Sequence, residues 1–168
     1  VPKDYRSYTI ETGKQKVLEV LFRHPEKESS LSDLAKEANV AKANIGAILD
    51  NFHKLEIIEI TKLSKIWRIK ANQQSIIFIR AKIIHNLNFI YQSGIVDFLY
   101  DYFKHPKSII LFGSFRKGED ISSSDIDIAV ESEEIKEYTA TGLRELSEFE
   151  KQISRKIQIH LFNNKHID

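Results

Sequence analysis

The sequence of 168 residues has no cysteine, only three prolines and six glycines, and no long uninterrupted apolar run. Without cysteine, the chain forms neither a disulfide nor a thiolate zinc site, and it suits a reducing cytoplasm. The six histidines show no paired ligand spacing, which argues against a histidine-based metal site. The most apolar stretch, residues 76–91, is interrupted by Arg80, Lys82 and His85. We therefore expect no membrane span and a cytoplasmic location.

Apolar residues make up 42% of the chain, enough for two small cores rather than one large one. Residues 1–104 carry 16 basic and 12 acidic side chains, whereas residues 105–168 carry 9 basic and 12 acidic ones. Residues 60–96 contain six basic residues and no acid. This asymmetry indicates a polyanionic partner for the N-terminal half, with an ordinary solvated face as the alternative.

Residues 109–130 carry the most informative pattern in the chain. An apolar run ends at Gly113-Ser114, and Asp125 and Asp127 then alternate with apolar residues. Alternation predicts a strand with both carboxylates on one face, about 6–7 Å apart. Two such acids can hold a divalent metal, and a Gly-Ser turn after a buried strand can present N–H groups and a hydroxyl to phosphate. The pattern indicates phosphoryl or nucleotidyl transfer. The alternative is a hairpin with solvent-facing aspartates.

Gly-Ser, a spacer of about ten residues and Asp-apolar-Asp together resemble the signature of the nucleotidyltransferase superfamily that includes DNA polymerase beta, above all its minimal prokaryotic members. The resemblance covers about residues 108–162. It implies that Asp125 and Asp127 are catalytic and bind Mg²⁺ or Mn²⁺, and that a nucleoside triphosphate is the substrate. The residues that it assigns to nucleotide binding are Gly113, Ser114, Lys117 and Ser124.

The resemblance also implies a third carboxylate, on a later strand, that activates the acceptor hydroxyl. The matching strand, 155–162, has Gln158 at that position and His160 next on the same face. Glutamine has no negative charge and cannot act as a base near neutral pH. Two hypotheses follow. The chain is an enzyme with an unknown acceptor, which includes a protein acceptor, or it is a regulator or antitoxin-like protein whose impaired domain only binds nucleotide or a partner.

The N-terminal pattern predicts helices over 14–22, 31–38 and 42–55, followed by strands over 57–63 and 66–70. This order resembles a winged helix-turn-helix. The resemblance implies that the third helix enters the major groove of duplex DNA, with Lys42, Ala43 and Asn44 near base edges. It also implies that the wing reaches the phosphates through Lys62, Lys65 and Arg68. The alternative is a winged helix that contacts protein.

We therefore predict an α+β protein with three parts: a winged helix (1–72), a helical connector (73–104) and a small mixed-sheet nucleotidyltransferase-like domain (105–168). Connector helices are expected over 75–91 and 95–103, and their wide apolar stripes either pack within the chain or join a homodimer. A further helix is expected over 134–151, with Leu143, Leu146 and Phe149 facing inward.

Overall fold

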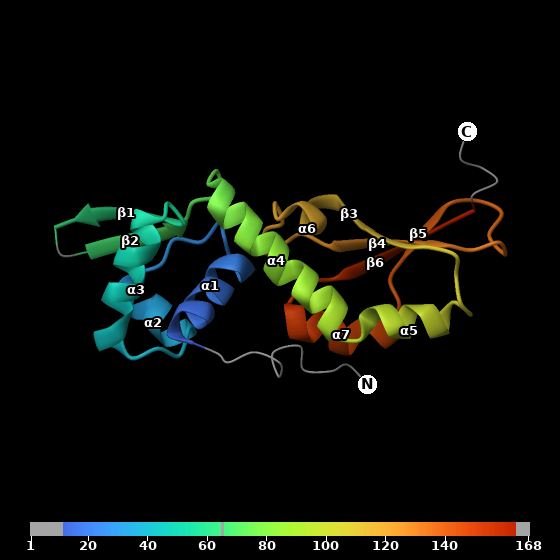
Figure 1. Ribbon diagram of the computed structural model, residues 1–168, viewed down its shortest axis with the longest axis horizontal. Coiled ribbons are helices and arrows are strands. Elements are labelled where there is room, and N and C mark those ends of the chain that lie inside the picture. The colour runs from blue at the N-terminus through green and yellow to red at the C-terminus, as the bar shows by residue number, and fades with distance from the viewer. Residues whose placement is uncertain (1–11, 65, 164–168) are drawn as a thin grey trace. The chain divides into compact units, whose positions relative to one another are not determined.

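The computed structural model describes residues 12–64 and 66–163, which form two compact units (Figure 1). Of the described residues, those up to Lys82 form the N-terminal unit and those from Ile83 onward the C-terminal unit, so the division falls inside helix α4 (Ile76–Gln92). Each unit has its own hydrophobic core, as the composition predicted. Within the described ranges, no helix combines the length and apolar character needed to cross a membrane.

Three helices open the N-terminal unit: α1 (Gly13–Arg23), α2 (Leu31–Glu37) and α3 (Lys42–Lys54). The Gln15 backbone N–H donates to the Thr12 hydroxyl and the Gln15 side chain accepts from the Thr12 N–H, a capping box that starts α1. Ser30 starts α2 by accepting a hydrogen bond from the Asp33 N–H. Ala41 precedes α3 and offers no side-chain cap. All three helices lie within two residues of their predicted ranges.

An antiparallel hairpin follows α3, with strands β1 (Ile58–Leu63) and β2 (Ile66–Ala71) close to the predicted strands. The backbone of Ser29, just before α2, pairs with Ile69 of β2 through two hydrogen bonds of 2.9 Å. The segment between α1 and α2 is thereby tied to the hairpin.

Helix α4 contributes to both cores. Phe78 belongs to the N-terminal core, where its ring centroid lies 5.4 Å from that of Phe22. Phe89 and Ile90 belong to the C-terminal core. Part of the apolar stripe that we considered for a homodimer is therefore covered within the chain, although Ile84 and Tyr91 remain exposed. Dimerisation stays a prediction.

The C-terminal unit contains a four-stranded mixed sheet in the order β3-β4-β6-β5. Its strands are β3 (Ile109–Phe112), β4 (Ile126–Glu131), β5 (Thr139–Thr141) and β6 (Ile157–Phe162). β4 runs antiparallel to β3 and parallel to β6, and β5 runs antiparallel to β6. Together with the helices, this sheet confirms the α+β class.

The two faces of this sheet differ in character. Ile126, Ile128 and Val130 of β4 are buried in the C-terminal core. Helices α5 (Ile95–Tyr102) and α7 (Ser147–Ile153) contribute to the same core and lie on one side of the sheet (Figure 1). The alternate residues of the two central strands face the other way. They include Asp127, Gln158 and His160.

The prediction of one helix over 134–151 is wrong for the first half of that range. Thr139–Thr141 forms the edge strand β5, and the 3₁₀ turn η1 (Arg144–Leu146) then leads into α7. Threonine favours strands and Gly142 disfavours a helix, so this part of the segment pairs with β6 instead. Leu146 and Phe149 are buried, as their helical spacing predicted.

Candidate active site

Gly113 stands where β3 passes into the short helix α6 (Gly113–Lys117). Its φ of +74° lies in the left-handed region that favours glycine. A Cβ at this position would lie 2.4 Å from Oδ2 of Asp127, which is closer than real Cβ contacts allow. The neighbouring Phe112 pairs with Asp127 across the strands, and this pairing brings the carboxylate to the turn. The Gly-Ser turn and one aspartate of the Asp-Ile-Asp sequence therefore meet directly.

The two aspartates occupy different surroundings. Asp127 lies on β4 and its side chain is 25% exposed. Asp125 lies one residue before the strand and is exposed, while Ile126 between them is fully buried. Asp125 lines a cleft of about 650 Å³. The other residues around this cleft are Gly142, Leu143, Arg144, Ser147, Glu150, Lys156, Ile157 and Gln158.

Gln158 is the direct partner of Asp127 in the parallel pairing of β4 with β6. Its amide therefore occupies the position, beside Asp127 and on the same face, where the resemblance implies a carboxylate. In the cleft, Lys156 is paired with Glu150 at 2.9 Å. Arg144 is exposed and has no ion-pair partner among the described residues. The cleft thus offers an amide oxygen and a free guanidinium beside Asp125.

His160 contacts the same aspartate. Its Nε2 lies 3.0 Å from Oδ1 of Asp127, and its Nδ1 is hydrogen bonded to the hydroxyl of Tyr138. The His160 side chain is 11% exposed, and its ring and that of Phe112 pack edge to face with 4.8 Å between centroids. Sequence reasoning placed His160 on the correct face. It missed Tyr138, because nothing in the local pattern indicates that β5 pairs with β6.

The remaining predicted nucleotide-binding residues lie on α6 and in the loop that follows it. Ser114 is half-buried in the first turn of α6, and Lys117 is exposed in its last turn. The Ser124 hydroxyl accepts a hydrogen bond from the Ile121 N–H at 2.9 Å. This bond closes the turn before Asp125, so Ser124 has a local structural role in addition to any contact with ligand.

A buried polar network supports this loop, and sequence reasoning missed it. Asp120 and Arg155 form an ion pair at 3.3 Å in which each side chain is 2% exposed. The Asn86 amide donates to Oδ1 of Asp120 at 2.9 Å and to the Phe115 carbonyl at 2.8 Å. The network joins α4, the α6–β4 loop and the residues just before β6. The only local signal of this network in the sequence was an acid, Asp120, two residues after Gly118. An acid at this position does not show that its side chain is buried.

The carboxylates of the candidate site suit magnesium only when a bound substrate supplies further oxygen ligands. Among residues 12–64 and 66–163, no group of three histidine or acidic side chains is placed to hold a metal ion. Magnesium, however, prefers oxygen ligands and is commonly held by one or two carboxylates together with substrate phosphates. Asp125 and Asp127 fit that arrangement. The second carboxyl oxygen of Asp127 faces Gly113, away from His160.

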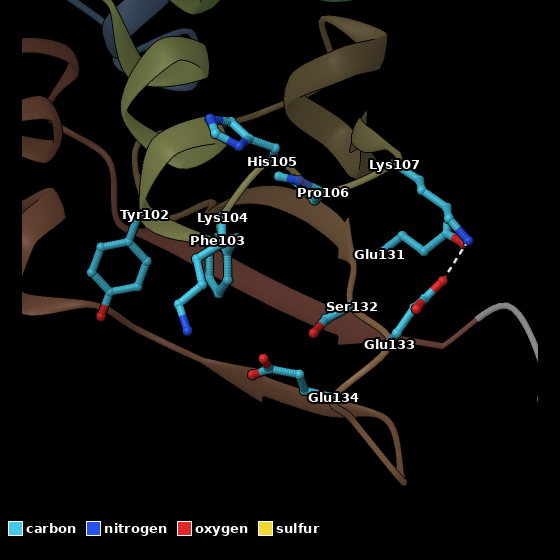
Figure 2. A pocket seen from close by; sticks show the side chains of 10 residues that line it. All are labelled: Tyr102, Phe103, Lys104, His105, Pro106, Lys107, Glu131, Ser132, Glu133 and Glu134. Atoms are coloured by element: carbon cyan, nitrogen blue, oxygen red, sulfur yellow. Dashed lines mark hydrogen bonds and ion pairs between the residues drawn. The ribbon is translucent and has the colours of Figure 1, made fainter.

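A second hollow, of about 410 Å³, lies at the other end of β4 (Figure 2). Glu131, Glu133 and Glu134 line it, and Lys107 forms an ion pair with Glu133. The hydrogen bond from Lys107 to Glu133, reinforced by the charge of Glu133, raises the pKa of Lys107 above its ordinary value. Its three carboxylates outnumber its two lysines, Lys104 and Lys107, so this hollow is a poorer candidate for a triphosphate than the turn at Gly113.

The predicted DNA-contacting residues lie on the surface of the N-terminal unit. Lys42, Ala43 and Asn44 are exposed at the start of α3. Lys62 lies over the Trp67 ring at 4.0 Å from its centroid, and Arg68 is 3.5 Å from Glu28. Lys65 lies outside the described residues. Lys82, which we counted in the acid-free basic stretch, is 1% exposed and adds nothing to a basic surface.

Comparison with known proteins bears on the C-terminal part. Residues 93–168 match the family model described as nucleotidyltransferase domain. The matched range takes in α5, the whole mixed sheet, the Gly-Ser turn and both aspartates. The match supports nucleotide transfer, at this general level, as the activity of this part of the chain. No curated protein and no solved structure matches the chain.

Proposed function

We propose that the C-terminal unit transfers a nucleotide from a nucleoside triphosphate to an acceptor hydroxyl, in a chain that also binds duplex DNA through its N-terminal unit. The observation that carries the first part is the approach of the Asp127 carboxylate to the Gly113 turn. A phosphate on the N–H groups of this turn would lie beside a carboxylate able to hold its metal.

Asp125 and Asp127 would hold Mg²⁺ or Mn²⁺. The ion would neutralise phosphate charge and favour attack at phosphorus. Around it, Ser114 offers a hydroxyl to the phosphates, and Lys117 offers a positive charge. Arg144 lies in the cleft that Asp125 lines, where its guanidinium would complement a triphosphate. The described polar groups are thus of the types that phosphoryl transfer requires.

A labelled-nucleotide transfer assay tests this proposal. The full chain is incubated with Mg²⁺ and each of ATP, CTP, GTP and UTP labelled at the α-phosphate, and pyrophosphate release is followed in parallel. Titration calorimetry compares wild type with the Asp125→Asn, Asp127→Asn double variant. We expect metal-dependent nucleotide binding in the wild type alone. Equal affinity in both proteins would refute the site.

The second candidate function is a regulator whose nucleotidyltransferase domain binds nucleotide with little or no transfer. The position of Gln158 beside Asp127 favours it, because the amide cannot take a proton from an acceptor. If a base is missing here, Gln158→Asp should strengthen metal binding and raise transfer by up to ~10²–10⁴-fold. Gln158→Ala is the control. Rapid wild-type transfer that Gln158→Ala leaves undiminished would reject the impaired-enzyme hypothesis.

The proposal of DNA binding rests on α3 and the hairpin. The first N–H groups of α3 lack a side-chain cap, and Lys42 and Asn44 are exposed beside them, which suits a phosphate or a base edge. The Ser29–Ile69 pairing supports the winged-helix interpretation, because it joins the segment before α2 to the hairpin. Gel shifts of the full chain over a salt series test it. Binding should weaken steeply as salt rises, and failure to bind duplex DNA at low salt would reject it.

A further inference from the structure

Tyr138, His160 and Asp127 form a hydrogen-bonded chain. A carboxylate only accepts hydrogen bonds, so the His160 Nε2, 3.0 Å from Asp127 Oδ1, carries the proton. In the neutral tautomer that carries this proton, Nδ1 has a lone pair and would accept a hydrogen bond from the Tyr138 hydroxyl. A hydroxyl bound to a base that is oriented by a third group is the arrangement of an activated nucleophile.

The surroundings of the three side chains fit this arrangement. Tyr138 is 65% exposed, so its hydroxyl is accessible, whereas His160 is 9% exposed. The imidazole is held between β6, from which it projects, and the Phe112 ring. Tyr138 immediately precedes the edge strand β5, which pairs Ala140 with His160. The phenol therefore lies one imidazole away from the carboxylate proposed to hold the metal.

We propose that Tyr138 is a nucleotide acceptor of this chain, modified by the chain's own site; this rests on the function proposed above. The Tyr138 hydroxyl oxygen attacks the α-phosphorus of a nucleoside triphosphate. A bond forms between that oxygen and the α-phosphorus, and the bond from the α-phosphorus to the oxygen bridging to the β-phosphate breaks. Pyrophosphate leaves, and the phenolic proton passes to Nδ1 of His160. His160 thereby takes the role that Gln158 cannot fill.

The chain contains a matched control in Tyr100. This tyrosine is 47% exposed, and its ring lies 4.7 Å from that of His105 between centroids. His105 Nε2 is in turn 3.9 Å from Asp101, too far for a hydrogen bond. The same three residue types thus occur together, but neither the histidine nor the aspartate lies on β4 or β6. Only the Tyr138 group includes an aspartate that touches the Gly-Ser turn.

The test is covalent labelling of the full chain. Wild type, Tyr138→Phe and Tyr100→Phe are incubated with Mg²⁺ and each of the four α-labelled nucleoside triphosphates, and the modified peptide is identified by mass spectrometry. We expect one nucleoside monophosphate on the peptide that contains Tyr138. Tyr138→Phe should lose this label, and Tyr100→Phe should keep it. Asp127→Asn should abolish it.

Binding and pyrophosphate release by the wild type, measured alongside, separate two kinds of failure. If the wild type binds Mg²⁺ with a nucleotide and releases pyrophosphate, yet Tyr138 stays unmodified or Tyr138→Phe is labelled as strongly, this inference is overturned and the proposed function stands. If the wild type neither binds nucleotide nor releases pyrophosphate, both are overturned.

Discussion

The two units keep their polar side chains in different places. In the N-terminal unit, the described residues proposed to contact DNA are all exposed, and the buried polar residues of this unit, Ser75 and Lys82, are not among them. In the C-terminal unit, Asn86, Asp120, Arg155 and His160 are buried around the candidate site. Buried polar groups must keep their partners, whereas exposed ones exchange partners with water at little cost. Function and stability should therefore be separable in the first unit and coupled in the second.

The largest effect should come from Asp120→Ala. This change leaves Arg155 as a buried cation without its partner carboxylate, which typically costs ~3–5 kcal/mol of unfolding free energy. Urea unfolding of the full chain measures it. The control is Glu148→Ala, which breaks an exposed pair with Lys151 whose side chains are 60% and 72% exposed, worth ~0–1 kcal/mol. Similar losses in the two variants would contradict the difference between buried and exposed polar groups on which the contrast between the units rests.

Gly113→Ala should cause the second largest effect, and it should impair nucleotide binding directly. The backbone strain at positive φ costs ~1–3 kcal/mol, and the new methyl group would push Asp127 from the turn. We expect nucleotide binding, measured by calorimetry, to be lost. Gly46→Ala serves as control, because its Cβ would meet nothing within 4 Å. Nucleotide affinity unchanged in Gly113→Ala would show that the turn does not hold phosphate.

In the N-terminal unit, Lys42→Ala and Lys62→Ala should weaken DNA binding while unfolding free energy changes by at most ~0.5 kcal/mol. Each lysine that contacts a phosphate contributes about one unit to the slope of log affinity against log salt. Arg68→Ala should weaken binding less, because Glu28 already offsets part of the arginine charge at 3.5 Å. Gel shifts and urea unfolding of the same proteins test the separation. A loss of stability that parallels the loss of binding would show that DNA binding and stability are not separable in this unit.

The smallest effect should come from Lys107→Ala in the second hollow. Because Glu133 raises the pKa of Lys107 in the folded chain, the pair stabilises the fold fully below the unfolded pKa. That contribution is lost as pH rises through the higher folded pKa. The pair is exposed, so the variant should melt only slightly below wild type at neutral pH. The melting temperatures of wild type and variant should converge in alkaline solution. A difference between them that widens there would contradict the predicted pH dependence.

How far the sequence predicted the structure differs between the units. In the N-terminal unit every predicted helix and strand is present, because helical spacing, Ser30 as a cap and a short hairpin are all local signals. In the C-terminal unit the same reasoning located β3, β4 and β6 but extended a helix through β5. An edge strand of three residues is stabilised by its partner strand, and its own sequence carries too few residues for a periodic signal.

By itself, the sequence determined the α+β class, the alternation that buries Ile126 between two aspartates, and a turn that only glycine adopts easily. These features depend on residues close together in the chain. The tertiary structure alone decided that Asp127 meets Gly113, that His160 reaches Asp127, and that Asp120 is buried against Arg155. Each of these contacts joins positions 14 to 35 residues apart. They depend on which strands pair and in which register. Pairing and register are set by the burial of the apolar face of the whole sheet, which no local pattern shows.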